Sequence, residues 1–142
     1  MFGKRQVRTT KKRAALKQIN AAIALFHVKE YECTISLAGA AEGLIVDTEP
    51  PHVWKILELR RPQEYSGKKW RARLNETRDW LKHPTEKLAD ERCIDEFEAV
   101  YMLIRAVSKF DARYNDSPKE HNDFASWCRA EGYIDSESKN DP

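Results

Sequence analysis

The sequence predicts an all-α fold, an up-and-down helical bundle of about five to six helices. Apolar residues recur at spacings of three and four along several segments, which is the period of one helix face. The 142 residues include five Gly and six Pro, too few for the dense turns of an all-β fold. Hydrophobic residues make up 41% of the chain, enough for one packed core. We therefore expect a single domain at 1–134 and a polar, disordered tail at 135–142.

Two helices are predicted in the first third of the chain. Thr9 or Thr10 can cap the first one. The second is expected over residues 31–46 and contains a run of small residues at 37–41, which lets a neighbouring helix approach closely. Glu42 follows this run, so we expect its carboxylate to be partly buried and to need a cation or donor. The apolar stripe of the first helix consists of Leu16, Ile19, Ile23 and Phe26.

The remaining helices are separated by proline and glycine. A short helical piece is expected at 53–59, after the break at Glu49-Pro50-Pro51. A basic helix is expected at 68–83 and the central long helix at 90–114. Ser117 should cap the last helix with Pro118 at its first position, and Gly132 should end it. Aromatic residues at helical spacing are interpreted as core: Trp70, Phe97, Phe110 and Trp127.

Charge is distributed unevenly along the chain. The net charge is +2, but residues 1–83 carry 17 Lys and Arg against 9 Asp and Glu, a balance of +8. Residues 84–142 carry 8 against 14, a balance of −6. This asymmetry indicates either a basic face for a polyanion or an ordinary solvated surface whose two halves pair across the bundle.

Cysteine usage and hydropathy predict a reducing, cytoplasmic setting. Cys33, Cys93 and Cys128 are far apart and form no CxxC pair, so each is interpreted as a small buried apolar residue. No apolar run approaches the roughly 20 residues needed to cross a bilayer. We expect no membrane partner.

Most catalytic and metal-binding motifs are missing from the sequence. It contains no Gly-rich phosphate loop, no HExxH and no paired Glu-x-x-His, and its four His are dispersed. We therefore expect no metal and no cofactor. One motif remains. Arg78 is followed, after four intervening residues, by His83 at the end of the basic helix.

This Arg-x4-His motif resembles that of the HEPN superfamily, all-α domains many of which are metal-independent endoribonucleases. Asp79 fits the residue that commonly follows the Arg. Further segments look like a small bacterial HEPN-like group, so that the resemblance spans residues 16–127. These segments are 35–44 (ISLAGAAEGL), 74–79 (LNETRD), 81–83 (LKH), 104–107 (IRAV) and 124–127 (FASW).

The resemblance implies RNA cleavage by attack of the 2′-hydroxyl on the adjacent phosphate. His83 would transfer a proton and Arg78 would stabilise the charge on phosphorus. Because His83 precedes Pro84, its backbone leaves the α region readily and the ring can swing off the helix end. Asn75 would orient His83 or the phosphate, and Glu42 and Arg105 would hold Arg78 in place. Asp79 would be accessory. The residues expected to bind the RNA backbone are Lys68, Lys69, Arg71, Arg73 and Lys82.

The resemblance also implies partners. A homodimer would bring two motifs together, and RNA, a cognate antitoxin or a nucleotidyltransferase are the other expected partners of a toxin or phage-defence effector. Two alternatives stay open: a non-catalytic dimeric binding module for nucleic acid, nucleotide or protein, and a structural bundle. In those cases Arg78 pairs with Glu42 or Asp79, and His83 is an ordinary helix end.

Overall fold

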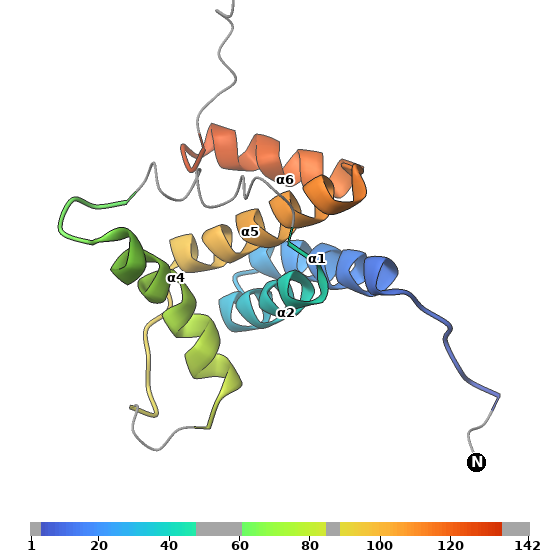
Figure 1. Ribbon diagram of the computed structural model, residues 1–142, viewed down its shortest axis with the longest axis horizontal. Coiled ribbons are helices and arrows are strands. Elements are labelled where there is room, and N and C mark those ends of the chain that lie inside the picture. The colour runs from blue at the N-terminus through green and yellow to red at the C-terminus, as the bar shows by residue number, and fades with distance from the viewer. Residues whose placement is uncertain (1–3, 48–60, 85–88, 135–142) are drawn as a thin grey trace, which may run out of the picture.

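The computed structural model describes residues 4–47, 61–84 and 89–134, which form five α-helices (Figure 1). No strand occurs in these ranges, so the predicted all-α fold is confirmed. The helical piece expected at 53–59 and the tail at 135–142 lie outside the described residues. None of the described helices combines the length and apolar character needed to span a membrane. The helices are α1 (Lys11–His27), α2 (Tyr31–Leu44), α4 (Gly67–Lys82), α5 (Glu96–Tyr114) and α6 (Lys119–Ala130).

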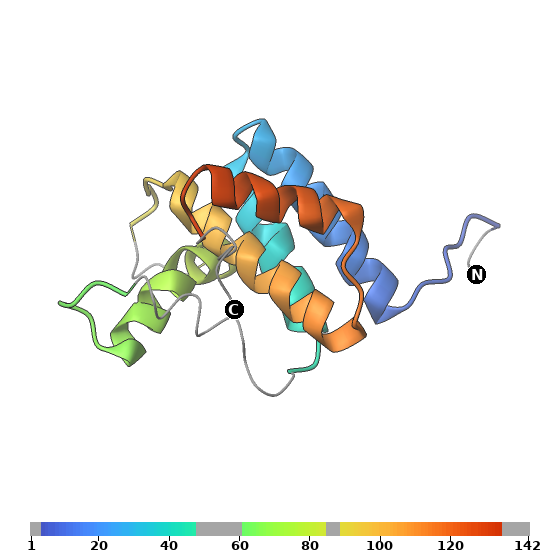
Figure 2. The ribbon, with the colours of Figure 1, turned by 90° about the horizontal axis from the view of Figure 1, so that it is seen from above.

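Helices α1 and α2 form an antiparallel pair, seen in both views (Figures 1 and 2). The Thr10 hydroxyl caps α1 by accepting the Arg13 backbone N–H at 3.1 Å, as predicted. The turn to α2 includes Lys29 at a positive φ of 65°. Fully buried alanines on the facing sides, such as Ala22 and Ala38, bring the two helices close together. Helix α2 ends at Leu44, two residues earlier than expected.

Helix α5 is the central element and contacts all the others. It begins at Glu96, six residues later than the predicted start at Asp90. The reason is a capping box, in which the Asp95 backbone N–H donates to the Glu98 carboxylate at 2.7 Å. Leu103 and Phe110 on this helix are completely buried. Helix α4 lies inclined across one end of α5, and α6 covers another side (Figure 1).

Two of the four aromatic residues predicted as core are buried. Trp70 and Phe110 are, whereas Phe97 and Trp127 are half-buried. Trp127 still packs against the core, so the prediction was wrong for Phe97. Phe97 lies near the exposed start of α5 against the Tyr101 ring. Trp127 stacks on Tyr133 near the end of α6, so part of its surface is covered by another ring rather than by a helix.

The start of α6 also differs from the prediction. Pro118 stands at the N-cap and the helix begins at Lys119. The Ser117 hydroxyl donates instead to Asp111 at 3.0 Å and lies 2.8 Å from the Asn122 side-chain oxygen. The buried His121 Nδ1 lies 2.7 Å from Asp111, which ties α6 to the end of α5.

Two of the three cysteines are not buried, contrary to the prediction. Cys33 is exposed because it lies away from the α2 face that carries Ile35 and Ala38. Cys93 is exposed in the extended segment before α5. Cys128 is completely buried, and burial raises the pKa of its thiol to about 12.

Candidate functional site

The end of α4 is positioned by a glycine on α2. A Cβ atom placed on Gly39 would lie 2.9 Å from Arg78 Cδ and 3.1 Å from Arg78 Cγ. Those separations are too short for any side chain, so glycine allows the aliphatic stem of Arg78 to lie directly on α2. The small-residue run thus admits α1 on the side of Ala38, as predicted, and the stem of Arg78 on the side of Gly39.

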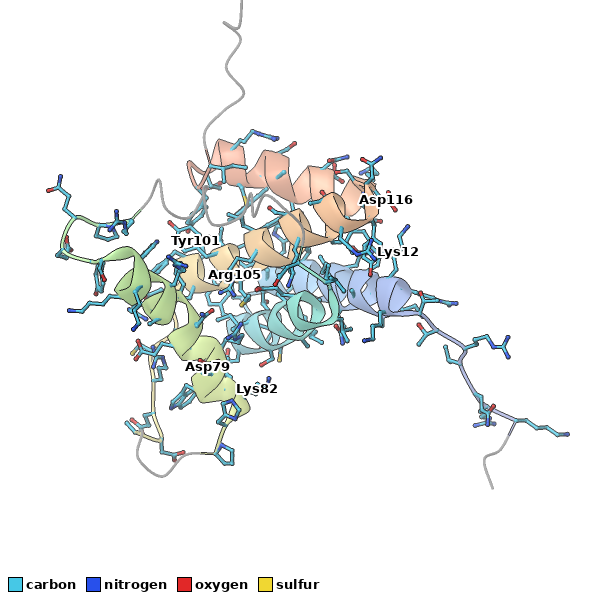
Figure 3. The ribbon with its side chains drawn as sticks, viewed as in Figure 1. Lys12, Asp79, Lys82, Tyr101, Arg105 and Asp116 are labelled. Carbon is cyan, nitrogen blue, oxygen red and sulfur yellow. The ribbon has the colours of Figure 1, made fainter. Side chains whose placement is uncertain are left out.

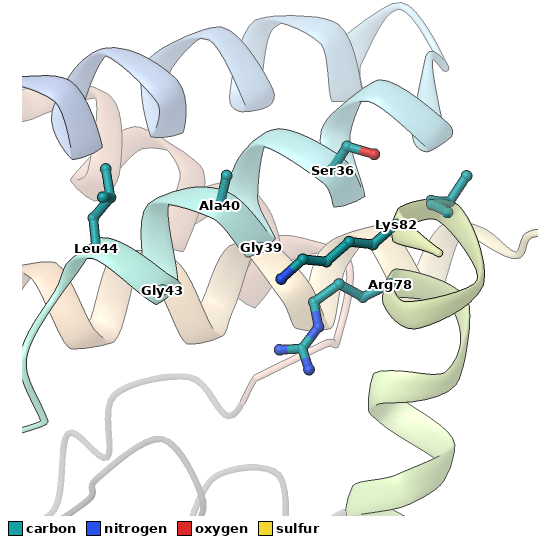
Figure 4. Close-up of a pocket in the computed structure, with 8 residues that line it drawn as sticks. Ser36, Gly39, Ala40, Gly43, Leu44, Arg78 and Lys82 are labelled. Carbon is teal, nitrogen blue, oxygen red and sulfur yellow. The ribbon is translucent and has the colours of Figure 1, made fainter. Parts of the chain in front are cut away.

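A pocket of about 610 Å³ lies between α2 and α4 (Figure 4). Its charged lining residues are Arg78 and Lys82, four positions apart and therefore on one face of α4. Both side chains extend from α4 along the surface of α2 (Figure 4). The remaining lining is small or apolar: Ser36, Gly39, Ala40, Gly43, Leu44 and Leu81.

Arg78 has a carboxylate neighbour, the adjacent Asp79. Arg78 Nε and Nη2 donate to Asp79 Oδ1 at 3.3 and 3.2 Å. Asp79 is half exposed, and ion pairs of that kind are screened by water and contribute little. The guanidinium can therefore exchange this contact for another anion at small energetic loss. Of the two anionic partners considered from the sequence, Asp79 and not Glu42 pairs with Arg78.

A buried polar network behind the pocket joins α2, α4 and α5. Arg105, which is 3% exposed, donates from Nη2 to Glu42 at 2.7 Å and from Nη1 to Asn75 at 2.5 Å. Lys109 adds a bond to the Glu42 backbone oxygen at 3.0 Å. Burial lowers the pKa of the Arg105 guanidinium below its ordinary value, which the Glu42 carboxylate opposes and the Arg78 charge reinforces.

The network involves residues that the sequence singled out, in a different arrangement. Asn75 was expected to orient His83 or a phosphate, whereas its side-chain oxygen accepts from Arg105. Glu42 and Arg105 were expected to hold Arg78, whereas Arg105 donates to Glu42 and to Asn75. They fix the helix that carries Arg78, and Figure 3 labels Arg105 on α5 and Asp79 and Lys82 near the end of α4.

His83 lies just beyond the last turn of α4. Its backbone is extended, with φ of −118° and ψ of 127°, so it leaves the helix before Pro84 as predicted. Its N–H donates to the Asp79 backbone oxygen at 3.0 Å, and the residue is exposed. The described residues that line the pocket include its neighbour Lys82 but not His83.

The other cations predicted to bind RNA fall into two groups. Lys68, Lys69 and Arg71 are exposed at the start of α4. Arg73 instead bonds Glu98 at 3.3 Å. That carboxylate is 7% exposed, so Arg73 neutralises a buried charge.

A second polar cluster, centred on Glu98, was not predicted from the sequence. The buried Thr77 hydroxyl donates to Glu98 at 2.5 Å, and Arg92 Nε donates to Thr77 at 3.0 Å. Arg92 also bonds Glu76 at 3.2 Å. These bonds join α4 to α5 and to the segment before it. The partners of Thr77 are 15 residues or more away in the sequence, and no local pattern connects them.

The described residues do not provide a set of metal ligands. Within residues 4–47, 61–84 and 89–134, no group of three His, Cys, Asp or Glu side chains could hold a metal ion. The site offers two cations, a hydroxyl and an adjacent imidazole, which suit an anion.

Comparison with known proteins adds no assignment, because no protein-family model, curated protein or solved structure matches the chain.

Proposed function

We propose that this protein is an RNA-binding domain of HEPN-like type that holds a backbone phosphate between Arg78 and Lys82. The supporting observation is the pocket of about 610 Å³ whose charged lining residues are these two cations. RNA is favoured over other polyanions by the resemblance of residues 35–44 and 74–83 to HEPN domains.

The residue types suit a phosphate. The planar guanidinium of Arg78 can donate two parallel hydrogen bonds to phosphate oxygens, and Lys82 supplies a compact charge beside it. The small side chains on α2, Gly39, Ala40 and Gly43, leave room for the sugar and the next phosphate. Partial burial of Arg78, whose side chain is 28% exposed, strengthens its attraction to an anion relative to a fully solvated lysine.

The proposal is tested by titrating a fluorescein-labelled single-stranded RNA and following fluorescence anisotropy. Arg78→Ala and Lys82→Ala should each weaken binding about ten-fold or more, the usual effect of losing a hydrogen bond to a charged group. Lys17→Ala is the matched control, since it removes one exposed lysine charge from α1 and should have a small effect. Equal losses for all three variants would mean that binding follows overall charge, and the pocket would have no specific role.

RNA cleavage is a second proposal, favoured by the position of His83. Its exposed ring follows Lys82 directly, on the helix that presents Arg78. In the proposed reaction the 2′-oxygen bonds to phosphorus and the bond from phosphorus to the 5′-oxygen breaks. His83 transfers a proton at the 2′-hydroxyl or at the leaving oxygen, and Arg78 stabilises the added negative charge.

Cleavage needs more than the single protomer provides, because His83 does not line the pocket with Arg78. We therefore propose that cleavage takes place in a homodimer, in which the His83 of one copy approaches the Arg78 of the other. An antitoxin or nucleotidyltransferase partner, and a role in phage defence, remain part of this second proposal.

The test is a cleavage assay on single-stranded RNA in EDTA with wild type and His83→Ala. Cleavage by wild type alone supports the second proposal. If neither protein cleaves, or both cleave equally, His83 has no catalytic role and the binding function stands by itself.

A further inference from the structure

A second pocket adjoins the first on the other side of α4. Its volume is about 550 Å³, and its lining residues are Tyr31, Glu32, Trp80, Leu81, Arg92 and Ile94. Leu81 also lines the pocket that contains Arg78 and Lys82, so the two pockets share one lining residue.

The second pocket is aromatic, and its rings are held in place. The Trp80 indole N–H donates to the Ala89 carbonyl at 2.8 Å, which fixes the orientation of the ring on α4. The Tyr31 ring lies 5.8 Å from the buried Phe26 ring, which supports it from behind. Aromatic faces of this kind bind nucleobases, and stacking accepts any base because every base has a π-face.

The two charged residues in this pocket have different roles. The Arg92 guanidinium bonds Glu76 at 3.2 Å and Thr77 at 3.0 Å, so its charge is paired within the protein. Glu32 is exposed at the start of α2, and its carboxylate forms no hydrogen bond or ion pair with the described part of the chain. Glu32 is therefore an available acceptor at the edge of an aromatic pocket.

We infer that this aromatic pocket holds an unpaired base of the RNA strand whose phosphate lies between Arg78 and Lys82. The inference rests on the proposed function and adds a base-binding subsite next to the phosphate pocket. Within one strand a base and a neighbouring phosphate can occupy adjoining pockets, whereas a base in a duplex is paired and stacked and cannot enter. The Glu32 carboxylate favours guanine, whose Watson–Crick edge offers two adjacent N–H donors, over uracil, which offers one.

The experiment compares RNA with a probe that has phosphates and no base. Labelled UUGUU and UUUUU are titrated by anisotropy, and unlabelled inorganic tripolyphosphate is used as the competitor. Trp80→Leu keeps an apolar side chain but removes the π-face, and it should weaken RNA binding about ten-fold, as expected for one stacked base. Trp80→Phe keeps a π-face but loses the indole N–H that bonds Ala89, so it should weaken RNA binding less than Trp80→Leu does. The inhibition constant of tripolyphosphate, calculated with the RNA affinity of each variant, should be unchanged by either substitution.

The outcomes separate this inference from the proposed function. If wild type binds RNA and tripolyphosphate but Trp80→Leu binds RNA equally well, the base pocket is excluded and the phosphate pocket stands. If wild type binds neither, both are excluded. A preference for UUGUU that Glu32→Gln reduces supports guanine selection, and equal binding of the two RNAs by wild type overturns it. Circular dichroism melting of each variant shows whether a loss of binding reflects a loss of folding.

Discussion

Gly39 on α2 and Arg78 on α4 are in direct contact, and the contact has no room for a Cβ atom. The separation of 2.9 Å from Arg78 Cδ leaves one way to accommodate any larger residue, which is to move the arginine stem. Because Arg78 lines the pocket beside Lys82, the backbone of α2 determines where the guanidinium lies.

Gly39→Ala should therefore weaken RNA binding more than Gly43→Ala, which adds a methyl group to the pocket but does not displace Arg78. Alanine in place of glycine within a helix stabilises it by up to about 1 kcal/mol. At Gly43, where a Cβ would meet nothing within 4 Å, that gain should appear as a higher melting temperature. At Gly39 the cost of displacing the Arg78 stem should offset this gain in stability. Equal RNA affinity of the two variants would show that the position of Arg78 is not set by this contact.

The Glu42–Arg105 ion pair should be a strongly coupled pair in a double-mutant cycle. Glu42→Ala leaves the Arg105 charge buried without its carboxylate, and breaking a buried pair in this way destabilises by about 3–5 kcal/mol. Arg105→Ala leaves Glu42 in the same situation, so the double variant should lose much less than the sum of the single losses. Urea unfolding of the four proteins measures the coupling, and additive losses would contradict it.

The three thiols should differ sharply in reactivity. Cys33 and Cys93 are exposed and should be alkylated by iodoacetamide in the native protein. Burial raises the pKa of the Cys128 thiol to about 12, so Cys128 stays protonated and unreactive from pH 7 to pH 9. Mass spectrometry should find two labels under native conditions and three in urea. A third native label that grows between pH 7 and 9 would contradict the burial of Cys128.

The helices were predictable from sequence because each buries one stripe of apolar residues. The start of α5 was not recognised, although its signal was present, because Asp95 followed three residues later by Glu98 is a capping-box pattern. The half-burial of Phe97 and Trp127 could not be predicted, because periodicity identifies a face and not how far a neighbouring helix covers it.

The candidate site was predictable as a region and not as a set of contacts. The position of Glu42 after a run of small residues and the resemblance of Asn75 and Arg105 to HEPN site residues singled out these three, and the structure brings them together. Which of them pairs with which depends on the rotation of α4 relative to α5, and local sequence does not encode that rotation. The Arg73–Glu98 contact was missed for the same reason.

Arg73 and Lys82 lie on the same helix, and we expect a structural role for Arg73 and the proposed RNA-binding role for Lys82. Arg73 bonds the nearly buried Glu98, so Arg73→Ala should lower the free energy of unfolding and leave RNA affinity nearly unchanged. Lys82 is exposed at the pocket, so Lys82→Ala should leave unfolding nearly unchanged and weaken RNA binding. Both substitutions remove one positive charge from α4, so a difference between them cannot come from net charge. Urea unfolding and anisotropy titrations of the two variants measure the two effects. If both variants lose RNA affinity equally and neither loses stability, α4 acts as a uniformly basic face and the assignment of separate roles is wrong.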